Sequence, residues 1–328
     1  MSNMEQISIE VFVLMVADIN DEIKLGSVVM NLQTDNGQLR GELKLNEPLA
    51  KHTSWRVGGP ADRLYVPADL DDLCVFISHQ DEDEVYVWLG LGSNLLVRDG
   101  GIRGTVIAVA GILNELEICD SHRVRVGAGV TCNKFARFAA NAELTGIEFL
   151  AGIPGTVGGA LAMNAGAFGG ETWDRVAVAE TVNRHGELRS RSRDEYQIGY
   201  RHVSLPENEW FVAAEFQLEP DKNGAAHKKI REFLGRRSAT QPTGESSCGS
   251  VFRNPVGDYA ARLIDICGLK GVQIGTARVS GKHANFIVND GGASAADIEE
   301  LIMYVQKQVK EKTGIDLDLE VRIIGERL

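Results

Sequence analysis

The chain is poor in three features that would have assigned it to a class at once: basic charge, paired cysteines and long apolar runs. Against 46 acidic residues stand 34 lysines and arginines, a formal net charge of -12. Non-specific nucleic-acid binding needs a basic face, so we expect no nucleic-acid partner, although a local basic pocket for an acidic small molecule remains compatible with this charge.

The cysteines and histidines exclude two further classes of site. The five cysteines are odd in number and scattered without C-x-x-C spacing, which is typical of reduced thiols and predicts no disulfide framework or zinc site; they are Cys74, Cys119, Cys132, Cys248 and Cys267. His52, His202 and His283 have no metal-ligand spacing, so we expect no metal.

No segment is expected to enter a membrane or to direct secretion. The apolar run Val11–Ala17 is too short to span a bilayer and has no basic segment before it. We therefore expect a cytoplasmic protein. Residues 1–40 match no later pattern and are treated as an extension of unknown structure.

What the chain does have is glycine, concentrated in Gly152–Gly170, where seven of 19 residues are glycine. Ordered glycine is entropically costly, so a folded protein concentrates it where the backbone bends sharply or approaches a ligand. Short apolar residues fill the gaps, and Asn164 is the one strong side-chain hydrogen bonder. This composition predicts a buried ligand-binding loop; the alternative, a surface linker, is normally rich in Ser, Lys and Glu.

A second glycine cluster lies in Val85–Arg98, around Gly90, Gly92, Ser93 and Asn94. Gly90-x-Gly92 resembles the start of a dinucleotide fingerprint, but a third glycine and a following helix are missing, which disfavours a Rossmann domain. Two strands joined by a Gly-Ser-Asn turn can still bind an anion through consecutive N–H groups.

The order of predicted elements indicates an α+β protein with two lobes and a smaller C-terminal unit. Helices are predicted at Leu70–His79, capped by Asp69, and near 133–142. Strands are predicted at Val85–Leu89, Thr105–Ala110, Arg123–Val126, Val176–Val182 and Phe211–Leu218. We expect lobes at about 41–110 and 111–220, with Glu219–Ala225 as a linker.

The C-terminal unit, 221–328, is predicted to be α/β. Three helices are expected there: one that contains Ile230, one capped by Asp258, and one that begins at a capping box opened by Ser294. The last predicted element is a strand at Asp316–Ile324, where apolar and charged residues alternate.

Three isolated polar residues are candidates for chemistry. Arg201 at a strand end could clamp a carboxylate, although such arginines are usually solvated. Ser250, between Gly249 and Val251, is either a turn serine or a hydrogen-bond or proton donor in a pocket. Glu320 is by pattern a solvated strand carboxylate unless a pocket lies above its face.

Seven motifs together resemble one family. In order along the chain they are Thr53–Ala61, Leu89–Val97, Gly127–Gly129, Gly152–Gly159, Gly199–Arg201, Gly249–Pro255 and Leu319–Gly325. The chain is similar, over about residues 41–326, to the UDP-N-acetylenolpyruvoylglucosamine reductases (MurB), flavoenzymes of peptidoglycan precursor synthesis.

The resemblance implies a two-lobed FAD-binding domain of the p-cresol methylhydroxylase (PCMH) or vanillyl-alcohol-oxidase type, followed by a smaller α/β substrate-binding domain. It implies FAD and NADPH as cofactors. Cofactor-binding residues are then expected to be Trp55, Arg56, Gly58, Gly59, Gly90, Gly92, Ser93, Asn94, Gly152, Ile153, Pro154, Gly155, Gly158, Gly159 and Asn164.

The resemblance implies the activity named UDP-N-acetylmuramate dehydrogenase, working in the direction that reduces the enolpyruvyl ether to UDP-N-acetylmuramate. Hydride passes from NADPH to FAD and then to C3 of UDP-N-acetylglucosamine enolpyruvate, and C2 is protonated. Arg201 and Glu320 would stabilise the substrate carboxylate, and Ser250 would donate the proton, with Cys248 as the alternative donor. Substrate contacts are expected from Tyr200, Arg237, Asn254, Lys270 and His283.

The resemblance departs from part of the family at Leu205–Trp210. Type I members carry an insertion with a substrate-covering tyrosine here, and this chain resembles type II, which lacks it. Two other functions remain open: an oxidase on the same flavin fold, and a non-catalytic nucleotide-sugar-binding regulator. We expect a monomer or weak homo-oligomer that has no membrane partner.

Overall fold

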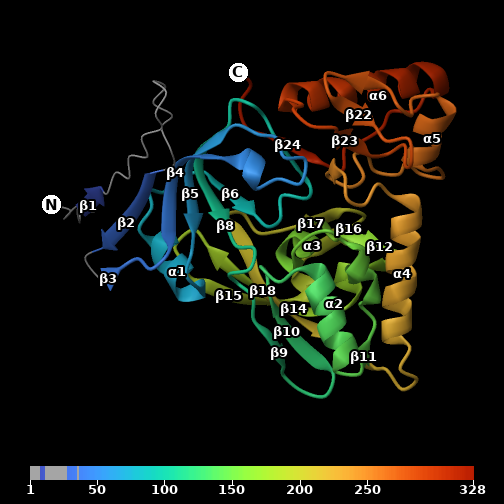
Figure 1. Cartoon of the computed structure of the whole chain (residues 1–328). Coiled ribbons are helices and arrows are strands. Elements are labelled where there is room, and N and C mark those ends of the chain that lie inside the picture. Colours follow the sequence, from blue (N-terminus) through green and yellow to red (C-terminus); the bar gives the residue numbers. More distant parts are fainter. Residues whose placement is uncertain (1–7, 12–27, 35–36) are drawn as a thin grey trace.

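The computed structural model describes residues 8–11, 28–34 and 37–328. They form two β-sheet lobes, a long connecting helix and a C-terminal α/β unit (Figure 1). Residues 12–17 of the apolar run at Val11–Ala17 lie outside the described residues. The α+β class expected from the sequence is confirmed.

The first lobe is a mixed sheet in the order β1-β2-β4-β5-β8-β6, with β3 paired to β2. Two pairs, β5 with β8 and β6 with β8, are parallel. The strands are β1 (Ser8–Val11), β2 (Val28–Thr34), β3 (Gly37–Gln38), β4 (Glu42–Pro48), β5 (Pro60–Val66), β6 (Tyr86–Leu89) and β8 (Ile102–Ala108). Part of the N-terminal extension thus adds strands to the edge beyond β4.

Helix α1 (Leu70–Ser78) covers this lobe, and its start is the one the sequence predicts. The Asp69 side chain accepts a hydrogen bond from the backbone N–H of Asp72 at 2.9 Å, which satisfies one of the free N–H groups of the first turn. Leu73, Phe76 and Ile77 are buried against the sheet.

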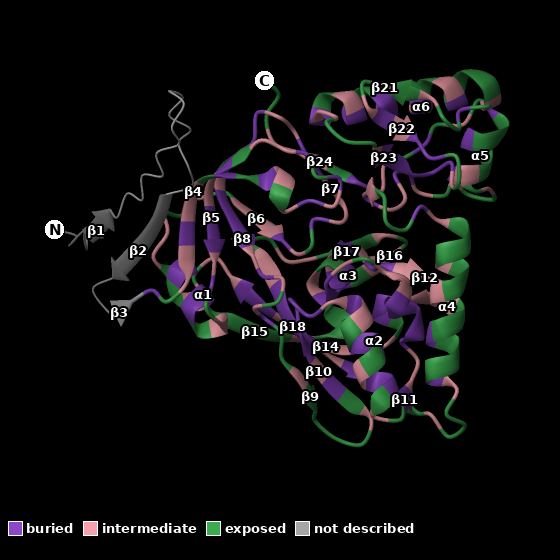
Figure 2. Cartoon of the chain, viewed as in Figure 1, coloured by how far each residue is buried: buried purple, intermediate pink, exposed green. Residues whose placement is uncertain are grey.

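The second lobe is an antiparallel sheet in the order β15-β14-β18-β10-β9. Its strands are β9 (Leu116–Ile118), β10 (Arg123–Gly127), β14 (Val176–Asn183), β15 (Leu188–Ser192) and β18 (Glu209–Gln217). Helix α2 (Cys132–Asn141) buries Phe135 against Phe216 of β18, with ring centroids 4.8 Å apart. Buried residues lie along the inner strands of the sheets, such as β5, β8 and β18, whereas the outer side of α4 is exposed (Figure 2).

The glycine-rich segment is only partly the loop that the sequence predicts. It leaves the 3-10 helix at Glu148–Gly152, turns at Ile153–Gly155, and then forms helix α3 (Val157–Met163). The Thr156 hydroxyl caps α3 by accepting from the N–H of Gly159. The close packing of α3 accounts for one of its glycines. A Cβ at Gly158 would lie 2.8 Å from the Cβ of Ala128, so only glycine at this position lets α3 pack this closely.

Three short strand pairs complete the second lobe: β11 (Leu144–Thr145) with β19 (Glu219–Pro220), and the hairpins of β12 (Gly166–Ala167) with β13 (Gly170–Glu171) and of β16 (Gln197–Gly199) with β17 (His202–Ser204). The predicted linker Glu219–Ala225 is ordered by these contacts. Its Asp221 carboxylate accepts from the N–H groups of Ala225 and Ala226 at 2.9 and 2.8 Å, at the start of α4 (Ala226–Thr240).

The C-terminal unit is a small sheet with two helices. Its elements are β20 (Ser246–Ser247), α5 (Ala260–Ile266), β21 (Gln273–Ile274), β22 (Ala277–Val279), β23 (Ile287–Asn289) and α6 (Ala295–Thr313). The capping box of Ser294 with Asp297 is confirmed, and Gly314 ends α6 in the left-handed conformation. The predicted cap at Asp258 is wrong: Tyr259 precedes α5, and the Asn254 side chain accepts from the Ala260 N–H at 3.1 Å.

The end of the chain returns to the first lobe. Strand β24 (Arg322–Ile324) pairs in parallel with β7 (Leu95–Val97), immediately after the Gly90–Asn94 turn. The predicted strand Asp316–Ile324 is therefore too long, because only its last three residues find a neighbouring strand; Leu319 makes a single bridge to Phe252. This return brings C-terminal side chains against both glycine segments.

Candidate active site

A central cavity of about 190 Å³ lies where the two glycine segments meet the C-terminal unit. Its lining includes Arg201, Ser250 and Glu320, which come from three separate parts of the chain. The lining also includes Ser93, Asn94, Gly152, Ile153, Pro154, Gly166, Tyr200, Arg237, Gln241, Cys248, Gly249, Phe252, Asn254, Asn285 and Phe286. The fold thus gathers the three candidate catalytic residues in one place.

Arg201 occupies the turn between β16 and β17, with a positive φ of 53° that is uncommon for a residue with a side chain. Its side chain is only 14% exposed. One terminal nitrogen donates to the Gly166 carbonyl at 2.8 Å, and the guanidinium lies 4.8 Å from the centre of the Tyr200 ring. These contacts hold the guanidinium in the cavity wall.

Glu320 lies beside this guanidinium, with its Oε1 3.4 Å from Arg201 Nε. Two backbone contacts position it: its N–H donates to the Val251 carbonyl at 2.8 Å, and its carbonyl accepts from the Asn94 side chain at 3.1 Å. Burial raises the pKa of the Glu320 carboxyl above its usual range, and the positive charge of Arg201 only partly opposes this.

Ser250 lies on a segment that the Asn285 side chain clamps. Asn285 accepts from the Phe252 N–H at 3.0 Å and donates to the Phe252 carbonyl at 2.8 Å. Gly249 takes a φ of 74°, which turns the chain just before the serine. Among the described residues the Ser250 hydroxyl has no hydrogen-bond partner, so it is free to bond a ligand.

Cys248 lines the same cavity, but its environment differs from that of Ser250. Its Sγ is 3.0 Å from the Ser93 carbonyl oxygen, to which the thiol donates. Full burial raises the pKa of the Cys248 thiol well above its usual range. The thiol therefore stays protonated and is occupied in joining the C-terminal unit to the Gly90–Asn94 turn.

The two glycine segments touch one another beside the central cavity. A Cβ on Gly90 would lie 2.6 Å from the Thr156 hydroxyl oxygen, and a Cβ on Gly92, whose φ is 58°, would lie 2.2 Å from the His52 carbonyl oxygen. Only glycine fits both positions. A connecting cavity, lined by Gly90–Leu95, Ile153, Gly155, Thr156, Gly159 and Arg322, runs along this contact.

The connecting cavity adjoins a larger space between the lobes, which we call the interlobe cavity and which encloses about 420 Å³. Both are lined by Trp88, Gly90, Leu95, Thr156 and Gly159. Such a chain of spaces, walled by glycine and small apolar residues, fits an elongated ligand such as a dinucleotide.

Most predicted cofactor residues line these three cavities: Gly90, Gly92, Ser93, Asn94, Gly152, Ile153, Pro154, Gly155, Gly158 and Gly159. The remaining predicted cofactor residues, Trp55, Arg56, Gly58, Gly59 and Asn164, do not.

Asn164 and Trp55 are used within the protein. The Asn164 amide donates to Glu171 and to the Gly199 carbonyl, which fixes the approach to Arg201. The Trp55 indole donates to the Ile287 carbonyl at 2.7 Å and joins the first lobe to the C-terminal unit. Both residues therefore hold the cavity walls in place through hydrogen bonds within the protein and do not line the cavities themselves.

Predicted substrate residues divide in the same way. Tyr200, Arg237 and Asn254 line the central cavity, whereas Lys270 and His283 do not. Lys270 pairs with Asp265 at 2.7 Å. His283 packs edge-on to Phe286, and burial lowers the pKa of its imidazole.

Sequence reasoning missed several residues of the site, chiefly Gln241, Asn285, Phe286 and Arg322. Asn285 gave no signal, because an isolated asparagine before an apolar run is common. Arg322 gave one: it lies two residues after Glu320 on the same predicted face.

Within the described residues, no helix is long and apolar enough to cross a membrane. In the same part of the chain, no three His, Cys, Asp or Glu side chains gather as metal ligands would.

Two regions of the chain match known protein families. Residues 61–191 match an FAD binding domain, and residues 241–324 match the C-terminal domain of UDP-N-acetylenolpyruvoylglucosamine reductase.

Similar proteins cover nearly the whole chain. The UDP-N-acetylenolpyruvoylglucosamine reductase of Methylococcus capsulatus is 58% identical over 88% of this chain and 94% of that protein. That of Alkalilimnicola ehrlichii is 56% identical over 87% of this chain and 96% of that protein.

Solved structures agree in fold. The MurB crystal structure from Thermus caldophilus is 35% identical, covers 87% of this chain and 98% of that one, and superposes with a TM-score of 0.74. At 13% identity, 6-hydroxy-D-nicotine oxidase from Arthrobacter nicotinovorans covers 85% of this chain and 88% of that one with a TM-score of 0.53, which supports the PCMH-type fold alone. From residue 41 onward, the fold, the glycine segments and these similarities agree: the chain belongs to the UDP-N-acetylenolpyruvoylglucosamine reductase family.

Proposed function

We propose that this chain reduces the enolpyruvyl ether of UDP-N-acetylglucosamine to the lactyl ether of UDP-N-acetylmuramate, using FAD and NADPH. The observation that carries the proposal is the meeting of Arg201, Glu320 and Ser250 in one cavity, next to two glycine segments fitted for a dinucleotide. Membership of the family supports the same substrate and cofactors.

FAD, when bound, supplies the hydride relay between NADPH and C3 of the substrate. The residues that would hold it are those of the turn Gly90–Asn94 and of Gly152–Gly159. The contacts of Gly90 with Thr156 and of Gly92 with His52 leave no room for a side chain at either position, so the two segments lie close together along the connecting cavity.

Arg201 and Glu320 act on the substrate carboxylate. The guanidinium binds it with charge-assisted hydrogen bonds. When hydride arrives at C3, negative charge develops on this carboxylate, and a preorganised cation in a partly buried site stabilises that charge more strongly than water does. Glu320, whose Oε1 lies 3.4 Å from Arg201 Nε, orients the guanidinium toward the same group.

Ser250 donates the proton to C2. A serine hydroxyl is a weak acid, but the carbon that forms beside the carboxylate is a strong base. The hydroxyl is free of partners among the described residues and lines the same cavity as Arg201 and Glu320. Cys248 is the weaker candidate because its thiol already bonds the Ser93 carbonyl.

Arg237 binds the diphosphate of the substrate. It lines the central cavity, donates to Gln241 at 3.1 Å, and within the described residues has no carboxylate partner. Burial lowers the pKa of its guanidinium because it removes water from the cation, and an anionic ligand would offset this loss of hydration. Tyr200 and Asn254 line the same cavity and would meet the rest of the substrate.

The proposal includes a cytoplasmic location, since NADPH and nucleotide sugars are cytoplasmic metabolites, and a monomeric or weakly associating protein. Its test is turnover by the purified chain. Incubation with NADPH and UDP-N-acetylglucosamine enolpyruvate should give a product heavier by two hydrogens in the mass spectrum. Consumption of O₂ with no change in the enolpyruvyl compound would instead support an oxidase on this fold.

A further inference from the structure

The segment that carries Ser250 pairs with the segment that carries Glu320. The Glu320 N–H donates to the Val251 carbonyl at 2.8 Å, and the Arg253 N–H donates to the Asp318 carbonyl at 2.8 Å. One antiparallel bridge lies between these two hydrogen bonds. Because such pairing fixes the register of the two segments, Arg253 holds a set position relative to Glu320.

The side chain of Arg253 reaches the turn that carries Arg201. Its Nη2 atom lies 3.5 Å from the carbonyl oxygen of Arg201. Arg201 has a positive φ of 53°, a backbone conformation that is costly for a residue with a side chain and persists only where its surroundings hold it. Arg253 is part of those surroundings, since it contacts the carbonyl of the strained residue itself.

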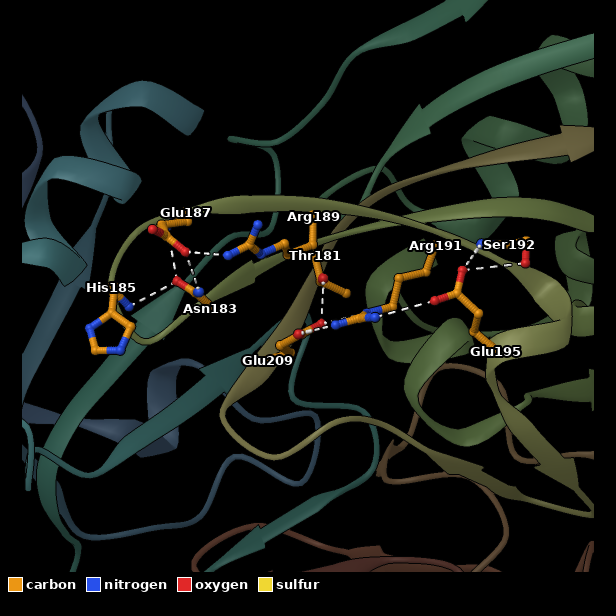
Figure 3. A network of polar contacts seen from close by, with 9 residues as sticks. All are labelled: Thr181, Asn183, His185, Glu187, Arg189, Arg191, Ser192, Glu195 and Glu209. Carbon is orange, nitrogen blue, oxygen red and sulfur yellow. Dashed lines mark hydrogen bonds and ion pairs between the residues drawn. The ribbon is translucent and has the colours of Figure 1, made fainter.

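Arg253 is not a surface arginine with a carboxylate partner. Arg191 on β15 shows the usual arrangement, because its guanidinium contacts the carboxylates of Glu195 and Glu209 (Figure 3). Within the described residues the Arg253 guanidinium forms no ion pair, and its Nε is buried without a hydrogen-bond partner. A buried donor without a partner is costly, so another role must account for the residue at this position.

Glu320 is subject to positive charge from two elements. Burial raises the pKa of its carboxyl, and the charges of Arg201 and of Arg253 act in the opposite direction. The Cys248 thiol also lies near this carboxyl but stays protonated, because burial raises its pKa. Glu171 lies 3.9 Å from Arg201 Nη1 and offsets part of that arginine's charge. The second cation, Arg253, therefore helps Glu320 to stay ionised beside Arg201.

We propose that Arg253 is a positioning residue: it joins the Arg201 turn to the Glu320 segment, so that guanidinium and carboxylate meet the substrate together. Arg201, Ser250 and Glu320 line the central cavity and Arg253 does not, so Arg253 acts through the residues that do. This inference rests on the proposed function. It concerns the substrate half-reaction alone, because flavin reduction by NADPH does not involve the substrate carboxylate.

The test measures both half-reactions of the flavin-loaded, full-length protein by stopped-flow absorbance at several pH values. Arg253→Gln should slow flavin reoxidation by UDP-N-acetylglucosamine enolpyruvate about 10–100-fold, as expected when reacting groups are misplaced, and leave flavin reduction by NADPH unchanged. Loss of a cation raises the pKa of a nearby carboxyl, so the pH below which reoxidation slows should also rise. A residue that only supports the fold would not move this pH limit.

Two further variants separate charge from geometry and from general effects. Arg253→Lys keeps the charge and loses the planar fork, so it should keep the wild-type pH limit and recover only part of the reoxidation rate. The matched control is Arg189→Gln, which removes an exposed arginine of the second lobe paired with Glu187 (Figure 3). It should change neither half-reaction.

The outcomes distinguish this inference from the proposed function. A wild-type protein whose reduced flavin is not reoxidised by the enolpyruvyl substrate overturns both. Wild-type turnover together with an Arg253→Gln variant of unchanged rate and pH dependence overturns the inference alone, as does equal slowing of both half-reactions. If Arg253→Gln fails to fold, Arg253→Lys decides: slower reoxidation with normal flavin reduction and the wild-type pH limit supports the inference, and any other result overturns it.

Discussion

Arg201 Nε and Glu320 Oε1 lie 3.4 Å apart, although one residue belongs to a hairpin of the second lobe and the other to the segment that closes the chain. The cavity wall at this point exists only when the C-terminal unit is docked on the lobes. In the function proposed here, the pair therefore makes the positioning of the substrate carboxylate depend on the association of the two parts of the fold.

The role of Ser250 predicts a selective defect. Ser250→Ala should leave flavin reduction by NADPH unchanged and slow flavin reoxidation by the enolpyruvyl substrate by about 10²–10⁴-fold, as expected for loss of a general acid. Stopped-flow absorbance measures the two half-reactions separately. Ser246→Ala on β20 is the control and should affect neither. Equal slowing of both half-reactions would refute the proton-donor role.

Arg201 predicts a loss in the same half-reaction. Arg201→Ala should lower kcat/KM for the enolpyruvyl substrate. The decrease should correspond to a loss of about 3 kcal/mol of transition-state stabilisation, by analogy with the removal of oxyanion donors. Arg201→Lys should recover only part, because lysine keeps the charge but not the fork. Steady-state kinetics with varied substrate gives the value, and a kcat/KM near that of the wild type would remove Arg201 from the site.

Glu320 predicts a stability difference that depends on pH. Its folded pKa is raised above the ordinary value of 4.5, so its contribution to stability is present below that pH and is lost as the pH rises through the folded pKa. The unfolding free energy of Glu320→Gln, relative to wild type, should thus increase as the pH rises past 4.5. Urea unfolding across this range tests it, with Asp318→Asn, an exposed carboxylate, as control. A difference that falls with pH would contradict the assignment.

For Glu299 we expect the opposite dependence of stability on pH. It joins α6 to the first lobe through Arg98 at 2.9 Å and to the C-terminus through Arg327 at 2.7 Å, and these partners, Arg98 above all, lower its pKa from 4.5 to about 2. Glu299 therefore stabilises the fold at pH values above its pKa in the unfolded chain. This contribution is lost as the pH falls through its lower pKa in the folded protein.

Glu299→Gln should therefore lose roughly 1–3 kcal/mol of unfolding free energy at neutral pH. That deficit should shrink as the pH falls from 4.5 toward about 2. Thermal or urea unfolding at several pH values measures it. A deficit independent of pH would show that packing, rather than charge, explains the effect.

Arg201, Ser250 and Glu320, which line one cavity, were singled out from the sequence because they lie in motifs that occur in the order typical of a known family. The local pattern around each residue leaves its role ambiguous. The alternation of apolar and charged residues predicts that Glu320 is a solvated carboxylate on a strand. Only the resemblance to the family predicts that it faces a substrate pocket. The structure supplies the physical reason: residues before Arg322 find no partner strand, so the segment bends across the C-terminal unit and Glu320 enters the cavity.

Other parts of the fold could not be predicted from local pattern. Glycine disfavours a helix, yet α3 forms within the glycine-rich segment because Gly158 must pack against Ala128 and Thr156 caps the first turn. Asn164 was predicted to bind the cofactor, and it is the one strong side-chain hydrogen bonder of the segment. Its amide donates to Glu171 and to the Gly199 carbonyl, partners that no local reading of the sequence identifies.

The most direct test of the account is an anaerobic flavin spectrum of the purified protein, with NADPH added first and UDP-N-acetylglucosamine enolpyruvate second. The account predicts that NADPH bleaches the flavin absorbance and that the enolpyruvyl substrate restores it, with UDP-N-acetylmuramate as the product. Bleaching with no recovery on adding the substrate would contradict the central claim, because the flavin site would then serve a different electron acceptor.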